Sequence, residues 1–99
     1  MSKKRITNLD VSLPVLIKKE GGVFVAYTPA LDISTYGKSE SKAKKNFEEL
    51  VQVYFEEFID QPHALDEVLD SLGWIKHKNN WQPPKITNTF QDITVPLAI

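Results

Sequence analysis

The stretch with the clearest chemical suggestion is DISTYGKS, residues 32–39, because it ends in Gly-Lys-Ser. A phosphate-binding P-loop ends in the same three residues, between a strand and a helix, and its backbone amides hold the phosphate oxygens. The first glycine of that motif would stand five residues before Gly37, where this chain has Asp32 with its side chain and negative charge. We therefore interpret Gly37 as a sharp exit from a strand and Ser39 as the N-cap of a helix.

Other residue types that perform catalysis or bind metals are sparse. The chain has no cysteine, which excludes disulfides, thiolate catalysis and cysteine-based zinc sites. His63 and His77 fall in different predicted elements without a paired ligand spacing, so we interpret them as surface residues. No Gly-x-Ser-x-Gly signature of a nucleophile is present. The sequence thus predicts no catalytic residue, metal or cofactor.

Two weaker alternatives stay open. A metal-dependent nuclease would need three aspartates from neighbouring strands, and the candidates are Asp10, Asp32 and Asp92. A platform that stacks single-stranded RNA would need adjacent aromatic rings, and the candidates are Phe24, Tyr27 and Tyr36. Packing in the core or along a sheet edge explains the same aromatic residues without RNA.

Hydrophobic periodicity supplies the elements that would position these residues. Alternation of apolar and polar residues over 9–18 predicts a strand, and Pro14 suggests an edge or a bulge within it. Gly21-Gly22 predicts a tight turn, followed by a strand that ends before Pro29 and a third strand over 30–37. Three consecutive strands with short connections predict an antiparallel meander.

The period then changes to that of helices. A stripe of apolar residues over 43–59 predicts one long helix, which we expect to be the main cover of the sheet. Pro62 suits the first turn of a second helix, which Gly73 would end, and Trp74 would fold back over its last turn. Residues 75–88 predict a long connection, and 90–97 predict a fourth strand with Ile93, Val95 and Leu97 on one face.

The expected architecture is a single α+β domain of 99 residues, with both helices on one face of the sheet. Residues 1–5 would form a mobile basic tail and residues 75–99 a C-terminal arm and strand. The first ten residues contain no apolar stretch after their basic residues, so no signal peptide is predicted. With no segment of membrane-spanning length, we expect a cytoplasmic protein.

Charge is distributed unevenly, although the formal net charge is only -1. Residues 46–75, termed the acidic segment below, contain eight carboxylates and no Lys or Arg, while the remainder carries all twelve basic residues and five acids. Such a segment suits electrostatic docking to a basic partner, and a solvated face without a partner is the alternative. The candidate partner-binding residues are Glu48, Glu49, Glu56, Glu57 and Asp60.

Residues 21–58 resemble the HicB family of antitoxins, and the match extends over roughly residues 11–75, with the tail matching loosely. The resemblance rests on a "vAy.P.L" run followed by a glycine, a polar helix cap and an alanine-containing helix rich in carboxylates. The matching residues are Val25, Ala26, Tyr27, Pro29, Leu31, Gly37, Ser39 and Ala43, and LDSLGW, which contains Gly73, resembles the end of short members. Lys42 departs from the pattern, since family members usually have glutamate there.

The resemblance implies a partial ribonuclease-H-like fold without catalytic acids. It also implies a non-catalytic role, the neutralisation of a small basic mRNA-cleaving toxin of the HicA type, and homo-oligomerisation. Many family members carry a C-terminal DNA-binding domain, but only 26 residues follow Gly73 here, so no direct DNA binding is expected. An orphan module whose main property is self-association, through sheet edges marked by Pro14 and Pro96, remains the alternative.

Overall fold

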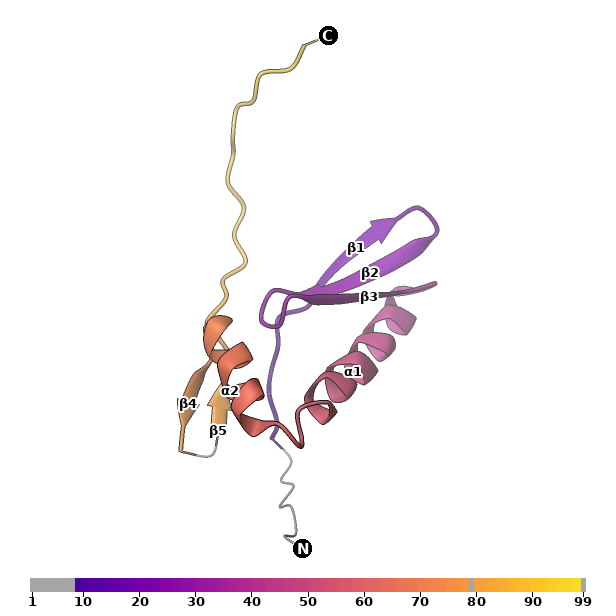
Figure 1. The fold of residues 1–99 in the computed structure, drawn as a ribbon. Helices are drawn as coiled ribbons and strands as arrows, with labels where there is room; N and C mark the ends of the chain where they lie inside the picture. The colour runs from indigo at the N-terminus through magenta and orange to yellow at the C-terminus, as the bar shows by residue number, and fades with distance from the viewer. Residues whose placement is uncertain (1–8, 79, 99) are drawn as a thin grey trace, which may run out of the picture.

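The computed structural model describes residues 9–78 and 80–98 (Figure 1). Its elements follow the order β1 (Leu16–Glu20), β2 (Val23–Thr28), β3 (Ile33–Gly37), α1 (Glu40–Glu56), α2 (Pro62–Ser71), β4 (Ile75–His77) and β5 (Asn80–Gln82). The predicted α+β class, the meander and the two helices are thereby confirmed. The predicted basic tail, residues 1–5, lies outside the described residues.

The three-stranded sheet is antiparallel throughout, in the order β1-β2-β3. A two-residue turn joins β1 to β2, and Gly21 adopts a φ of 59° there, a conformation that glycine accepts without steric cost. The first strand begins at Leu16, later than predicted, and residues 9–15 run as irregular chain. Pro14 cannot donate a hydrogen bond to a neighbouring strand, which accounts for the late start.

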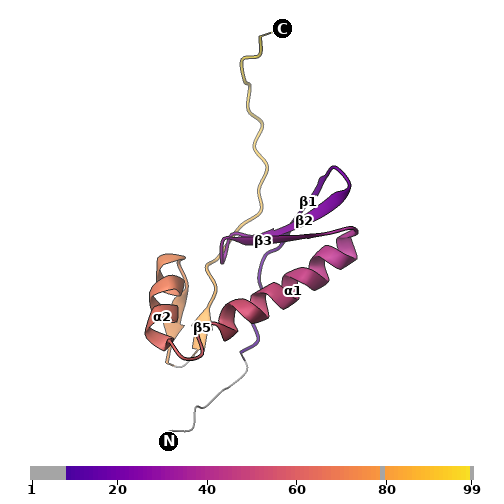
Figure 2. The same cartoon turned by 45° about the vertical axis from the view of Figure 1, so that its right-hand side comes forward.

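One face of the sheet is covered by α1, and Figure 2 shows the sheet nearly edge-on with the helix along its lower side. Ala26 of β2 meets Ala43 and Phe47 of α1 in a buried cluster, and Ala26 and Ala43 are both fully buried. Because neighbouring residues of a strand point to opposite faces, Ile17, Phe24 and Ile33 join this cluster. Neither helix of the described chain covers the opposite face of the sheet, which we call the uncovered face.

A second cluster forms where α2 meets the β2–β3 loop and the end of α1. It is built on Ala30, Leu31, Leu69 and Trp74, all at most 3% exposed. Gly73 ends α2 with a φ of 89°, and Trp74 turns back so that its amide donates to the Leu69 carbonyl at 3.0 Å. The expected return of Trp74 over the last turn of α2 is thus confirmed.

The C-terminal region differs from the prediction. Part of the expected long connection forms a short hairpin, β4 paired with β5, and no strand forms over 90–97 among the described residues. Residues 83–98 instead run as an extended segment away from the body of the molecule (Figure 1), and we call residues 86–98 the arm. Alternation alone predicts a strand, but a strand also needs a neighbour to satisfy its backbone groups.

Candidate partner-binding surface

The five predicted partner-binding carboxylates are all exposed, but they do not form a single patch. Side chains advance by about 100° per helical residue, so Glu49 and Glu56, two turns apart, share the outer face of α1 opposite Phe47. Glu48 and Glu57 lie on opposite flanks of that face. Asp60 lies beyond the helix, in the turn that leads to α2.

The acidic segment continues along α2. Glu67 and Asp70 are exposed, whereas Asp66 is half-buried and accepts a hydrogen bond from Lys76 Nζ at 3.1 Å. Lys76 belongs to β4, so the hairpin brings one basic residue onto a region that lacks any in its own sequence. Both helices therefore carry exposed carboxylates, and one carboxylate of α2, Asp66, is paired with a lysine.

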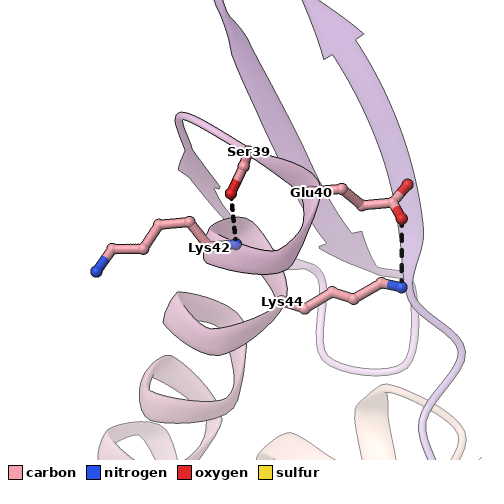
Figure 3. Close-up of polar contacts among 4 residues, drawn as sticks. All are labelled: Ser39, Glu40, Lys42 and Lys44. Carbon is pink, nitrogen blue, oxygen red and sulfur yellow. Dashed lines mark hydrogen bonds and ion pairs between the residues drawn. The ribbon is translucent and has the colours of Figure 1, made fainter.

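Along α1 the charge changes from basic to acidic. Lys42, Lys44 and Lys45 lie in its first two turns, and Lys44 Nζ is 3.5 Å from a Glu40 carboxylate oxygen, one turn earlier (Figure 3). The last turn has no basic residue and contains Glu56. A helix dipole favours the reverse arrangement, with acids at the N-terminus and bases at the C-terminus. Helix stability therefore does not explain where these charges lie.

Gly37 and Ser39 have structural roles that account for the Gly-Lys-Ser sequence. Ser39 Oγ accepts a hydrogen bond of 3.0 Å from the Lys42 amide and so caps α1 (Figure 3). A Cβ at Gly37 would lie 2.5 Å from the backbone nitrogen of Ala43, which shows that the helix start packs directly on the end of β3. The predicted cap is confirmed, and the glycine is required by the close approach of the helix backbone, since Gly37 has no positive φ.

The end of β2 and the loop after it contain three more residues of the motif described in the sequence, namely Tyr27, Pro29 and Leu31. Tyr27 Oη donates a hydrogen bond of 2.9 Å to Asp32 Oδ1, and Asp32 has a φ of 54°. This hydrogen bond, together with partial burial and the negative charge of Asp32, raises the pKa of Tyr27 above 10.0. Pro29 lies in the loop, and Leu31 is 3% exposed in the second cluster.

The three aspartates of the nuclease alternative occupy separate parts of the chain. Asp10 precedes β1, Asp32 lies in the β2–β3 loop, and Asp92 lies in the arm. Within residues 9–78 and 80–98, no group of three carboxylate or histidine side chains is placed to hold a metal ion. The fold thus does not bring these candidates together.

The aromatic platform is also divided. Tyr27 and Tyr36 project from the uncovered face of the sheet, while Phe24 belongs to the cluster beneath α1. The apolar residues that share the uncovered face with the two tyrosines are Leu16, Val23 and Val25. Sequence parity could have shown this separation, because Phe24 and Tyr27 differ by an odd number of positions in one strand.

Comparison of the chain with protein-family models, with curated proteins and with solved structures gave no match. In the part of the chain that the structure describes, no helix combines the length and apolar character required to cross a membrane.

Proposed function

We propose that this chain is a non-catalytic, cytoplasmic antitoxin that binds and neutralises a small, basic, mRNA-cleaving toxin of the HicA type. The carrying observation is the set of exposed carboxylates on α1 and α2, supported by the resemblance of residues 21–58 to HicB antitoxins. The chain acts by covering the toxin, and it contributes no catalytic group of its own.

The electrostatic part of the proposal follows from exposure. Glu49, Glu56, Glu57, Glu67 and Asp70 are all exposed, so a partner can reach them without any rearrangement of the core. Charges on a surface steer an oppositely charged partner and accelerate the encounter, and salt screens this effect over a Debye length of about 8 Å at physiological ionic strength. Binding should therefore weaken as salt rises, mainly through a slower association rate.

Charge reversal tests this role. We expect Glu49→Lys with Glu56→Lys to slow association with a purified HicA-type toxin by about tenfold or more at low salt, within the range of electrostatic steering. The same variant should flatten the dependence of the association rate on salt. Stopped-flow fluorescence gives the rate, and residual cleavage of a reporter RNA gives the degree of neutralisation.

A matched control changes the same total charge elsewhere. Asp10→Lys with Glu20→Lys alters two exposed acids outside the acidic segment and should leave association near the wild-type rate after correction for net charge. If both variants slow association equally, net charge alone explains the effect. The acidic segment would then have no specific role in binding. A wild-type chain that neither binds the toxin nor protects the RNA would refute the proposed function itself.

A further inference from the structure

The arm exposes a row of apolar side chains as it runs away from the body of the molecule (Figure 1). Phe90 is 94% exposed, Ile93 72%, Val95 68% and Leu97 81%. Ile93, Val95 and Leu97 alternate with Asp92, Thr94 and Pro96, the pattern of a strand with one apolar face. Four large apolar residues exposed along an extended segment indicate a strand whose neighbouring strand is absent.

The sheet offers an edge in the same chain. β1 is the outer strand of the order β1-β2-β3, and β2 is its one partner within the described residues. The other edge is partly occupied, because Asn46 Nδ2 of α1 donates to the Tyr36 carbonyl of β3 at 2.9 Å. Of the two edges, β1 is therefore the one open to a further strand.

The turn geometry identifies which groups of β1 are available. In a two-residue hairpin the residues that flank the turn, here Glu20 and Val23, form a hydrogen-bonded pair, and such pairs alternate along the ladder. Lys18 and Leu16 then bond to β2. Ile17 and Lys19 direct their N–H and C=O groups to the outer edge.

Pro96 decides which residues of the arm can pair. Proline has no N–H, so in an added edge strand it must turn its nitrogen away from the neighbour. Residues two apart share that orientation, which leaves Ile93, Val95 and Leu97 to bond to the edge of β1. Directly opposite residues of an antiparallel pair lie on the same face of the sheet. The apolar row therefore falls on the same face as Ile17.

That face of the sheet is the apolar one. Ile17 belongs to the cluster beneath α1. An open groove continues from it, between residues 9–15 and α1, and its apolar lining is Leu9, Val11, Leu13, Val15, Phe47 and Val51. The hydrogen-bonding constraint from Pro96 and the apolar lining of the groove thus select the same orientation of the arm.

We propose that the arm adds as an antiparallel strand to β1 of a second copy of this chain, with Ile93 opposite Ile17. In this register Asp92 lies directly opposite Lys18 on the uncovered face, so opposite charges meet across the pair. Beyond Ile93, the next two apolar residues of the arm, Val95 and Leu97, continue toward the groove beside its lining residues. Each copy gives one arm and receives one, which closes a two-fold symmetric dimer.

A second copy is favoured as the partner because each chain contains both an open β1 edge and an arm. Within the described residues of one chain these two segments do not pair with each other. About thirteen extended residues span roughly 43 Å, enough to reach across a neighbouring domain. The acidic residue of the arm and the lysine of β1 add charge complementarity. The inference does not depend on the proposed toxin binding.

Light scattering gives the first test. The full chain of 11.3 kDa should have twice that mass at micromolar concentration, and a chain ending at Lys85 should have the monomer mass. The truncation keeps Pro84, whose side chain lies 3.5 Å from the position of a Cβ on Gly73, and circular dichroism checks that the body stays folded. In the full-length chain, Ile93→Lys should also shift the equilibrium to monomer. A wild-type monomer at millimolar concentration, or a dimer that survives truncation, would overturn the proposal.

Cross-linking gives the second test and fixes the register. The natural chain has no cysteine, so Lys18→Cys and Asp92→Cys introduce single thiols at a non-hydrogen-bonded pair. Such a pair has a Cα separation of about 4.5 Å, which a disulfide can span. A mixture of the two single variants should give a mixed disulfide, identified by its mass, in excess of both symmetric ones. Substitution of Glu20→Cys for Lys18→Cys should reduce its yield several-fold.

The outcomes separate the alternatives. A disulfide found only within one molecule of the double variant would show that the arm folds back on its own chain, which would overturn the exchange. A mixed disulfide that forms no faster than the symmetric ones would overturn the register. Preferential formation of the mixed disulfide, together with loss of dimer on truncation, supports both.

Discussion

The indole of Trp74 donates a hydrogen bond of 2.7 Å from Nε1 to the backbone carbonyl of Ala30, across 44 residues of sequence. Trp74 follows α2 and is 2% exposed, and Ala30 lies in the β2–β3 loop and is fully buried. The same indole also meets the Phe55 ring edge-on, with a centroid distance of 6.2 Å. This one side chain therefore ties the second helix to both the sheet and α1.

Removal of the indole donor should destabilise the fold. Trp74→Phe keeps an aromatic ring but leaves the buried Ala30 carbonyl without its partner, at an expected cost of about 1–3 kcal/mol in the free energy of unfolding. Trp74→Ala adds a cavity and should cost about 3–5 kcal/mol. Urea unfolding followed by circular dichroism measures both. Trp81→Phe, at a half-buried position, is the control, and an equal loss there would contradict the assigned role.

Gly37 should tolerate no side chain. A Cβ there would meet backbone atoms of α1 at 2.5 and 2.8 Å, which a side-chain rotation cannot relieve. Gly37→Ala should therefore lower the free energy of unfolding by about 1–3 kcal/mol, as overpacking does. Gly22→Ala meets no atom within 4 Å and should change it by about 0.5 kcal/mol or less. A loss at Gly37→Ala no larger than that at Gly22→Ala would contradict the assigned backbone contact with α1.

The N-cap of α1 should contribute measurably to stability. Ser39→Ala removes the acceptor of the Lys42 amide and should cost about 1 kcal/mol. Ser41→Ala, on an exposed residue of the first turn, replaces the same side chain where it forms no cap and should be neutral or slightly stabilising. Chemical unfolding of the two variants in parallel separates the cap from helix propensity.

Reversal of charge at the end of α1 should stabilise the helix. The last turn has no basic residue, so Glu57→Lys replaces an unfavourable charge near the C-terminus with a favourable one, a gain of about 0.3–1 kcal/mol at low salt. The gain should shrink as salt rises. Under the proposed function the same variant associates more slowly with the toxin. A variant that is both less stable and unchanged in binding would contradict both expectations.

Tyr27 should ionise at a higher pH than an ordinary tyrosine. Its hydrogen bond to Asp32 raises its pKa above 10.0, and partial burial and the aspartate charge add to the effect. Because the folded-state pKa is the higher one, this stabilisation is complete below about pH 10 and is lost as pH rises through the folded-state pKa. Asp32→Asn retains a residue that accepts positive φ but removes the charge, so the pKa should fall.

Absorbance at 295 nm measures this titration. Tyr27→Phe identifies the contribution of Tyr27 by difference from the other two tyrosines. A Tyr27 pKa that is the same in the wild type and in Asp32→Asn would contradict control by the Asp32 charge.

Local patterns determined most of the fold. The apolar alternation of β2 and β3 and the stripe from Ala43 to Ile59 predicted the sheet and its covering helix, because each pattern records the period of a buried face. Ser39, Pro62 and Gly73 marked the helix ends by conformational and hydrogen-bonding preferences that act within a few residues. The predicted strand over 90–97 failed because alternation specifies a strand's faces but not the existence of a neighbour.

The sequence by itself determined which residues are acidic, where the three-stranded meander and the two helices lie, and that the Gly-Lys-Ser motif lacks the first glycine of a P-loop. Only the tertiary structure decided that Glu49 and Glu56 share one face while Glu48 and Glu57 flank it, and that Lys76 neutralises Asp66. It also decided that, within the described chain, the outer edge of β1 and the arm do not pair with each other. Periodicity is a local property of the chain. Contacts between distant segments depend on how the elements pack, which no local pattern records.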